Sequence, residues 1–498
     1  MFFLRLLRVR LTAIVRSRFG GQVVRTDARK NEVRMKNRRL WSLSIAVVGA
    51  LALLVGCGGN SSPKILTPPP HTSSFTWVSG ANSKNGAGVY GTQGTTSASN
   101  VPGARQFPSS WTDSGGNLWL FGGNGLDSTG TGAYLNDLWK FDGTNWTWVA
   151  GSNVATQAGV YGVQGTAAPG NSPGGRPGAA TWTDSSGNLW LFGGYGLDSS
   201  SMVGELNDLW KFDGTNWTWV SGSNTFNTTG NYGAEGVADP GNVPGARDSS
   251  VSWVDSGGNL WLFGGSGFDS VGTSGLLNDL WKFDGTNWTW VGGSNVAKQA
   301  GTYGTKGTAA SSNVPGARAG AVAWRDSGGN FWLFGGSGVD SVGTSNILND
   351  LWKFDGSSWT WMGGSNVVDQ SGVYGTKGTA ASSNLPGARF YAVSWTDKNG
   401  KFWLFGGGGL DSTGANGSLN DLWQFDGANW TWVGGSELAD QSGAYGTKGT
   451  GSESNFPGGR LGFVSWTDKN GNLVLFGGAG LDASGSFGFL NDLWRLAP

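Results

Sequence analysis

Residues 136–142 read Asn-Asp-Leu-Trp-Lys-Phe-Asp, and close copies of this stretch recur through the chain. Its Asp-Leu-Trp core begins at positions 137, 208, 279, 350, 421 and 492, each 71 residues after the one before. Self-similarity at a fixed spacing is the signature of a repeat architecture. An arginine keeps the same period, at Arg105, Arg176, Arg247, Arg318, Arg389 and Arg460.

Each 71-residue unit predicts four short antiparallel strands, and no stretch within the repeats has the 3.6-residue period of a helix. The second strand is wholly apolar, which is typical of a strand covered on both faces, and Gly122-Gly123 is expected to end it. The third strand alternates with period two. In the first unit the expected strands are residues 105–112, 118–121, 136–142 and 146–149.

The two ends of the repeat region complement each other. The last unit reaches Pro498 after its third strand, and the Phe-Thr-Trp-Val stretch at 75–78 lies 71 residues before the fourth strand at 146–149. An open stack of repeats would need polar caps at both ends. We therefore predict an all-β fold, a closed six-bladed propeller over residues 74–498, in which the N-terminal strand completes the last blade.

The glycine doublet, the Asn-Asp-Leu-Trp stretch, the Phe-Asp pair and the tryptophan of the last strand resemble the kelch repeat. The resemblance covers residues 75–498 and implies a kelch-type propeller similar to the central domain of galactose oxidase. The unit is longer than a kelch repeat, which has roughly 50 residues. Copper-radical oxidases of this fold need two histidines and a Tyr–Cys crosslink. The chain has one histidine, His71, and one cysteine, Cys57, so that chemistry is excluded.

The region before the repeats predicts export. Residues 35–56 resemble a bacterial lipoprotein signal, with a basic head, an apolar run and Leu-Val-Gly before Cys57. The resemblance implies cleavage before Cys57, lipid attachment to its thiol, and a location in the bacterial cell envelope, at the outer membrane or cell surface. The alternative is a single-pass anchor or a buried cysteine. Residues 57–73 predict a flexible tether. Residues 1–34 indicate a start codon assigned too early or an extended signal region.

The charge distribution argues against a nucleic-acid partner. The chain has 33 basic and 33 acidic residues, but its first 56 residues hold 12 basic and 2 acidic ones. The remainder is acidic, with 21 basic and 31 acidic residues, and is unsuited to a phosphate backbone. One cysteine and one histidine allow neither an internal disulfide nor a zinc cluster. We expect a monomer.

The connections of an antiparallel blade fall on two faces of the propeller. The turns 113–117 and 142–145 share one face, the short-turn face. The loop 124–135 and the inter-blade connection 150–175 share the other, the long-loop face. Loops carry binding function more often than scaffold strands. We therefore expect a ligand on the long-loop face, near the mouth of the channel. The alternative is that these loops only pack against one another.

A residue present in all six units serves the scaffold first, so the repeated arginines and aspartates are expected to pair between blades. The positions that differ are more informative about a ligand. These positions are the two residues after the repeated arginine and the residue after the glycine doublet. A further position, shortly before the expected third strand, is a glutamate in the second unit only. The candidate ligand-face residues are Gln106, Tyr195, Glu205, Asp248, Phe390 and Tyr391.

Each long connection also carries a tyrosine. A ring of six aromatic residues on a polar face could stack on sugars. The alternative, which we favour, is that each tyrosine pins its loop to the neighbouring blade with its hydroxyl hydrogen-bonded. These residues are Tyr90, Tyr161, Tyr232, Tyr303, Tyr374 and Tyr445.

Asp127 and its equivalents suggest a calcium site. Calcium needs six to eight oxygen ligands, however, and an Asx turn explains one aspartate per loop, so no cofactor is expected.

Three functions remain open. The sequence favours a lipid-anchored module that binds a glycan or an envelope protein. The alternatives are a kelch-type carbohydrate-active enzyme without copper and a purely structural envelope protein.

Overall fold

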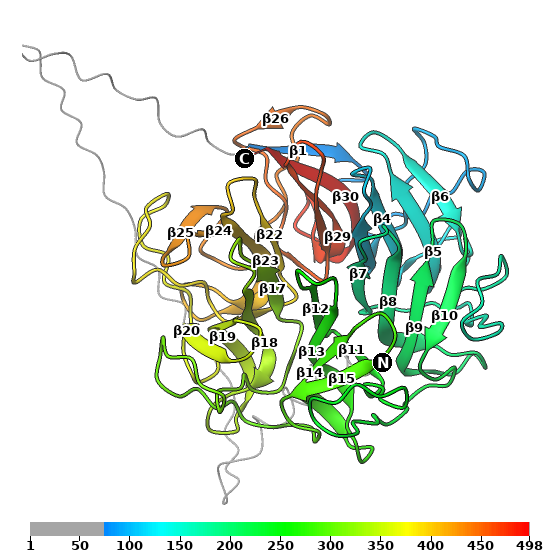
Figure 1. Ribbon diagram of the computed structural model, residues 1–498. Helices are drawn as coiled ribbons and strands as arrows, with labels where there is room; N and C mark the ends of the chain where they lie inside the picture. The colour runs from blue at the N-terminus through cyan, green and yellow to red at the C-terminus, as the bar shows by residue number, and fades with distance from the viewer. Residues whose placement is uncertain (1–73, 498) are drawn as a thin grey trace, which may run out of the picture. The chain divides into compact units, whose positions relative to one another are not determined.

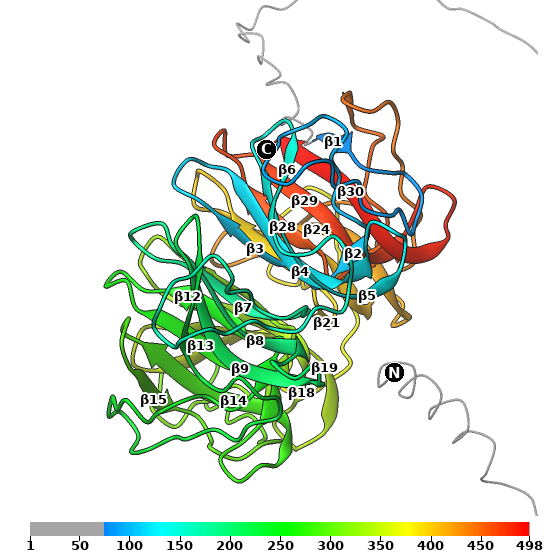
Figure 2. The ribbon, with the colours of Figure 1, turned by 90° about the vertical axis from the view of Figure 1, so that its right-hand side faces the viewer.

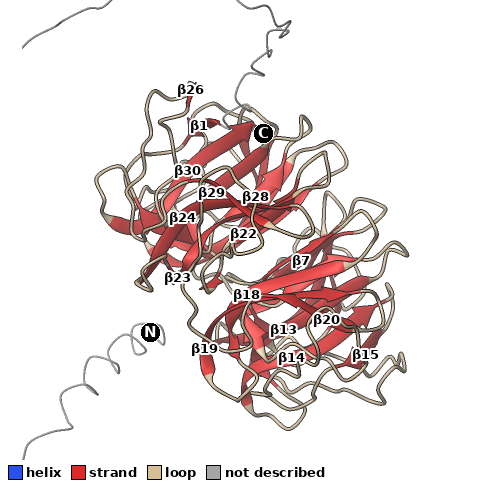
Figure 3. Ribbon diagram, turned by 90° about the vertical axis from the view of Figure 1, so that its left-hand side faces the viewer, coloured by secondary structure: helices blue, strands red, loops and turns tan. Residues whose placement is uncertain are grey.

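The computed structural model describes residues 74–497, and every regular element in this range is a β-strand (Figures 1 and 3). The strands form six antiparallel sheets around a common axis, which confirms the predicted six-bladed propeller. The predicted signal, the tether, Cys57 and His71 lie outside the described residues. Across residues 74–497 we find no helix long and apolar enough to cross a membrane.

The first blade shows how one unit folds. Its inner strand is split in two, its middle strands form a long hairpin, and its last strand lies at the outer edge. The inner strands of neighbouring blades contact one another in a closed circle, which places them around the axis. From the axis outward the strands are β2 (Arg105–Gln106), β3 (Ser109–Thr112), β4 (Leu118–Leu126), β5 (Gly132–Phe141) and β6 (Trp146–Ala150).

The other blades repeat this order. The second blade has β7 (Ala180–Thr183), β8 (Leu189–Leu197), β9 (Val203–Phe212) and β10 (Trp217–Ser221). The third has β11 (Arg247–Asp248), β12 (Val251–Val254), β13 (Leu260–Phe268), β14 (Ser274–Phe283) and β15 (Trp288–Gly292). The fourth has β16 (Arg318–Ala319), β17 (Val322–Arg325), β18 (Phe331–Val339), β19 (Ser345–Phe354) and β20 (Trp359–Gly363). The fifth has β21 (Arg389–Phe390), β22 (Val393–Thr396), β23 (Phe402–Leu410), β24 (Asn416–Phe425) and β25 (Trp430–Gly434). The sixth has β27 (Arg460–Leu461), β28 (Val464–Thr467), β29 (Leu473–Leu481), β30 (Phe487–Ala497) and β1 (Ser74–Ser79), and the short strand β26 (Gly451–Ser452) pairs with the outer side of β1.

The glycine doublet bends the second strand, and the prediction that it ends the strand is wrong. The register of β4 with β5 shifts at the doublet, and pairing then continues. Gly122 has a φ of +63°, and a Cβ there would lie 2.8 Å from the carbonyl oxygen of Arg176 in the next blade. Only glycine suits such a bulge. The strands are therefore longer than predicted, and the loop expected at 124–135 shrinks to 127–131.

The N-terminal strand closes the ring, as predicted. β1 pairs antiparallel with β30, with Phe75 opposite Leu496 and Trp77 opposite Trp494 (Figure 2). The Phe75 side chain is buried in the sixth blade and packs edge-on against Trp494. The first and last described strands of the chain thus share one sheet, and the outer edge of β30 is covered.

The repeated arginine and aspartate form an ion pair within each blade, which corrects the expectation that they pair between blades. Both terminal nitrogens of Arg105 lie 2.7 Å from the Asp137 carboxylate, and both side chains are fully buried. The Trp139 indole N–H also donates to this carboxylate, at 2.7 Å. Because Arg105 is in β2 and Asp137 in β5, each pair ties the inner strand of a blade to its third strand. Buried charges require such pairing, so these residues serve the scaffold.

Candidate functional site

The break in each inner strand closes the central channel with backbone. At this position the residue has a left-handed φ between 52° and 72°, and its N–H donates to the carbonyl oxygen of its equivalent in the preceding blade. These hydrogen bonds, of 2.5–3.1 Å, run around the axis without interruption. We call this arrangement the axial ring. Its members are Phe107, Gly178, Ser249, Gly320, Tyr391 and Gly462.

The side chains of the axial ring are uneven, and the glycines make room for the larger ones. The Phe107 ring lies against Gly462, and the Tyr391 ring lies against Gly320. The two aromatic rings meet edge-to-face with their centroids 4.5 Å apart. The Tyr391 and Ser249 hydroxyl oxygens are 3.0 Å apart. What remains at the axis is a cavity of about 150 Å³.

On the long-loop side of the axial ring, side chains from three blades form what we call the acidic–aromatic cluster. Tyr195 and Glu205 are register partners across β8 and β9 of the second blade. The Tyr134 ring from β5 stands edge-on to the Tyr195 ring, with centroids 6.0 Å apart. Asp248 of β11 reaches toward the second blade, where a Cβ on Gly178 would lie 3.6 Å from its Oδ2 atom. Tyr134, Tyr195, Glu205 and Asp248 all remain partly exposed.

The two carboxyl groups of this cluster have pKa values well above the ordinary values for Glu and Asp. Burial, followed by the charge of Asp248, raises the pKa of Glu205 to about 10, against the opposing influence of Arg247. Burial also raises the pKa of Asp248, to about 7, although a hydrogen bond from Ser249 opposes this shift. The Glu205 Oε2 atom is buried without a hydrogen-bond partner. The cluster therefore holds protons at neutral pH, as functional carboxyl pairs often do.

The structure brings together most of the candidate residues inferred from sequence. Tyr195, Glu205 and Asp248 form the acidic–aromatic cluster, whereas Tyr391 belongs to the axial ring and is joined to Phe390 by a ring contact of 5.4 Å. Gln106 lies in β2 opposite Asn124, immediately before the axial-ring residue Phe107.

Three residues of these two groups, namely Tyr134, Phe107 and Ser249, were not among the candidates chosen from the sequence. Each stands at a position that varies between repeats, and the alternation of glycine with larger residues in the axial ring was visible in the sequence.

The six loop tyrosines lie in the core. The Tyr90 hydroxyl donates to Asp137 at 2.6 Å, and its ring packs edge-to-face on Trp148 at 5.2 Å. The same two contacts recur in the other blades, from Tyr161 to Tyr445. Because these rings are buried, they present no stacking surface to a sugar. Each tyrosine fastens its long connection to the blade that follows it.

The loop aspartates hold the hairpin ends. Asp127 Oδ1 accepts hydrogen bonds from the N–H groups of Thr129 and Thr131, and Oδ2 accepts one from Ala155. Burial is the largest single influence on the pKa of the Asp127 carboxyl and raises it, but the hydrogen bonds together outweigh burial, so the pKa is lowered. Among residues 74–497 we find no group of three or more His, Cys, Asp or Glu side chains that could hold a metal ion.

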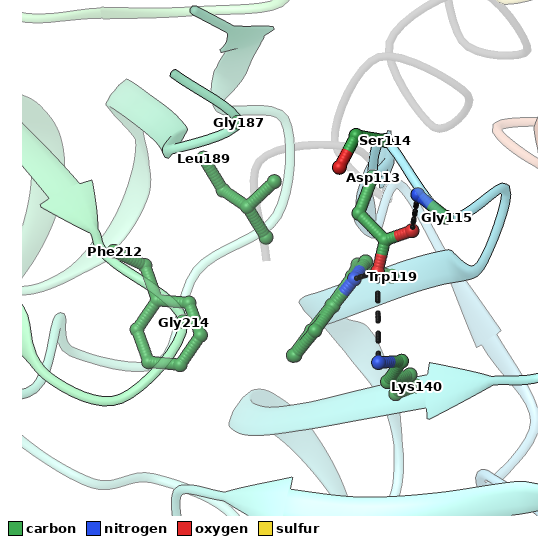
Figure 4. A pocket seen from close by; sticks show the side chains of 9 residues that line it. All are labelled: Asp113, Ser114, Gly115, Trp119, Lys140, Gly187, Leu189, Phe212 and Gly214. Atoms are coloured by element: carbon green, nitrogen blue, oxygen red, sulfur yellow. Dashed lines mark hydrogen bonds and ion pairs between the residues drawn. The ribbon is translucent and has the colours of Figure 1, made fainter.

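A second cavity, of about 290 Å³, opens on the short-turn face between the first two blades (Figure 4). Trp119 donates to Asp113 at 2.9 Å, and Lys140 Nζ lies 5.1 Å from the centre of the Trp119 ring. The same lysine–tryptophan contact recurs in the second, third and fourth blades. This repetition marks the cavity as a feature of the scaffold.

The fold and its axial closure define the class of protein as a six-bladed β-propeller. No protein-family model matches the sequence, and no curated protein matches it. Among solved structures, the protein YjhT is 15% identical with a TM-score of 0.45, and the match covers 79% of this chain and 95% of that one. A fungal alcohol oxidase of the AA5 family, in complex with copper, is 13% identical with a TM-score of 0.42, covering 82% and 77%. A protein of unknown function from Dyadobacter fermentans is 10% identical with a TM-score of 0.42, covering 83% and 99%. At these identities the likeness concerns the fold alone.

Proposed function

We propose that this propeller is a binding module of the cell envelope that takes a glycan or protein ligand on its long-loop face, held to the membrane by a lipid on Cys57. The observation that carries the proposal is the convergence of Tyr134, Tyr195, Glu205 and Asp248 at one place on that face. Each breaks the sixfold repeat at a position where the other blades form the same fold without it. Residues that the scaffold does not require, gathered from three blades, are best explained by a ligand.

The chemistry of the cluster suits a polar ligand with an apolar surface. Tyrosine rings offer faces and edges for stacking, and their hydroxyls and the carboxyl groups offer donors and acceptors. The neighbouring hairpin ends add exposed apolar side chains in the second, third and fourth blades, at Met202, Val271 and Val342. Exposed apolar residues around a polar centre are typical of interaction surfaces.

The test compares variants of the two faces. Tyr195→Ala should weaken binding to envelope glycans on an array, or to isolated envelope proteins, at least tenfold. Thr144→Ala, in an exposed turn of the short-turn face, should leave binding unchanged. Equal binding by both variants would refute the proposal, provided that circular dichroism shows both to be folded.

A second candidate is an acid–base enzyme acting on carbohydrates, and one observation favours it. The two carboxyl groups have pKa values raised to different levels, which is how proteins prepare one group to donate a proton and another to accept one. Under this alternative Asp248→Asn abolishes turnover of a sugar substrate and leaves substrate binding within a few-fold of the wild type. Under the binding proposal no turnover is found.

A further inference from the structure

The acidic–aromatic cluster has acidic groups without a free counter-charge. The cation that acts on Glu205 is Arg247. Arg247 is already bound through both terminal nitrogens to Asp279, at 2.7 Å each, and is fully buried. Asp248 has a hydrogen bond from Ser249, and burial, followed by the charges of these carboxyl groups, raises the pKa of the neighbouring tyrosines Tyr134, Tyr195 and Tyr391. When the carboxyl groups ionise, no unpaired cation among residues 74–497 acts on them.

We infer that the acidic–aromatic cluster binds a primary ammonium group, of the kind carried by a lysine side chain of a partner protein. This inference rests on the proposed function and names the chemical group that the long-loop face receives. The buried Glu205 Oε2 atom has no hydrogen-bond partner among the described residues, and the Glu205 residue as a whole is partly exposed. Asp248 supplies the second carboxylate, from the neighbouring blade.

The aromatic residues add a second, independent reason for a cation. The Tyr134 and Tyr195 rings stand edge-to-face, and Tyr195 is the register partner of Glu205, so two aromatic rings lie close to the carboxyl. A cation over a tyrosine face gains about 0.5–2 kcal/mol. The long apolar stem of lysine suits the exposed side chains of Met202 and Val271 on the adjacent hairpins.

A metal ion fits this place less well than an ammonium group. Calcium takes six to eight oxygen ligands, and the cluster offers two carboxylates from two blades. A primary ammonium has three donors and needs only three acceptors, which two carboxyl groups and a tyrosine hydroxyl can supply.

The charge of the cluster makes binding depend on pH in a defined direction. Lysine keeps its charge up to about pH 10, whereas Asp248 ionises near pH 7. Binding is therefore strong at pH 8 and weakens as the pH falls through about 7, because Asp248 takes up a proton. An ammonium group close to Glu205 also favours its ionised form, so binding at pH 8 releases protons.

The experiment uses two blocked tripeptides, Gly-Lys-Gly and Gly-norleucine-Gly, which differ in the ammonium group. Calorimetry at pH 8 should show saturable binding of the lysine peptide, at least tenfold weaker binding of the norleucine peptide, and proton release that depends on the buffer. Binding should fall at least tenfold at pH 5.5 and in Asp248→Asn. Glu235→Gln, an exposed acid on a long connection, is the matched control and should bind like the wild type.

Three results would overturn the inference: no saturable binding of the lysine peptide at pH 8, equal binding of the norleucine peptide, or unchanged binding by Asp248→Asn. The unfolding midpoint of each variant, measured in parallel, separates lost binding from lost fold. If the lysine peptide fails while Tyr195→Ala still weakens an envelope ligand, the ammonium inference falls and the proposed function stands.

Discussion

The hydroxyl of Tyr391 in the fifth blade lies 3.0 Å from the hydroxyl of Ser249 in the third blade. The contact passes over the fourth blade, whose axial-ring residue, Gly320, has no side chain in the way. Tyr391 also meets the Phe107 ring of the first blade, so two contacts that break the sixfold repeat join non-adjacent blades at the axis. Ser249 directly follows Asp248 in the sequence, so these asymmetric contacts are next to the acidic–aromatic cluster.

Adding a side chain to a glycine of the axial ring should lower the free energy of unfolding, and the loss should be larger where a neighbouring side chain already occupies the Cβ position. A Cβ on Gly462 would lie 2.5 Å from the Phe107 ring, whereas Gly236, with a similar positive φ, has no atom within 4 Å of its Cβ position. We expect Gly462→Ala to cost about 2–4 kcal/mol and Gly236→Ala about 1 kcal/mol in urea unfolding. The excess should disappear in a Phe107→Ala background. Additive effects in this double-mutant cycle would show that the ring does not fill the space.

Ring closure by β1 should determine the stability of the whole propeller. A chain that begins at Gly80 loses the strand that covers β30 and exposes the pocket of Phe75. Each buried aromatic side chain contributes roughly 1.5–3 kcal/mol, against a total stability of roughly 5–15 kcal/mol. We therefore expect this truncation to melt well below a control chain that begins at Ser74, or to aggregate through the open edge. Equal melting temperatures would mean that β1 is not part of the sheet in solution.

The buried ion pair should behave differently from the exposed one in the same blade. Asp137→Asn leaves Arg105 charged and fully buried, and should cost about 3–5 kcal/mol of unfolding free energy. Lys140, which lies 3.6 Å from Asp113, is partly exposed, and Lys140→Met should cost less than about 1 kcal/mol. Chemical denaturation measures both, and similar losses for the two variants would contradict the assignment.

Asp248 should make the protein less stable as the pH rises. Its pKa is raised in the folded state, so folding is opposed by ionisation between about pH 4 and pH 7, and the whole penalty is present above that range. Asp248→Asn should therefore be more stable than the wild type at pH 8, by about 1–4 kcal/mol, and the difference should shrink at pH 4.5. Thr144→Ala, at an exposed site on the short-turn face, changes no charge and should match the pH dependence of the wild type. A wild type as stable as Asp248→Asn at pH 8 would mean that the carboxyl is solvated.

The six blades and the closure by β1 could be predicted because a fixed spacing of 71 residues aligns every strand with its equivalents. The break at the axial ring could not, because a left-handed conformation at Phe107, Ser249 and Tyr391 has no local signal in residues other than glycine. The arginine–aspartate partners were expected between blades. The spacing shows that both residues recur in every unit, but it does not show whether an arginine pairs with the aspartate of its own blade or of a neighbouring blade.

Some residues of the candidate site could also be predicted from the sequence. Glu205 and Asp248 stood out because they break the repeat, but nothing in the spacing showed that β11 packs beside β8 and β9 and brings them together. For the six loop tyrosines the sequence favoured pinning of each loop to the neighbouring blade over a stacking surface, but the spacing did not show that the hydroxyl of Tyr90 bonds to Asp137.

The central claim, that the long-loop face receives the ligand, is tested most directly by photocrosslinking in the living cell. A photoreactive residue replaces Met202, in the loop of the β8–β9 hairpin that carries Tyr195 and Glu205, or Thr144 on the short-turn face, both of which are exposed. The account predicts a discrete adduct from position 202 that Asp248→Asn abolishes, and none from position 144. An adduct from position 144 alone, or one from position 202 that persists in Asp248→Asn, would contradict it.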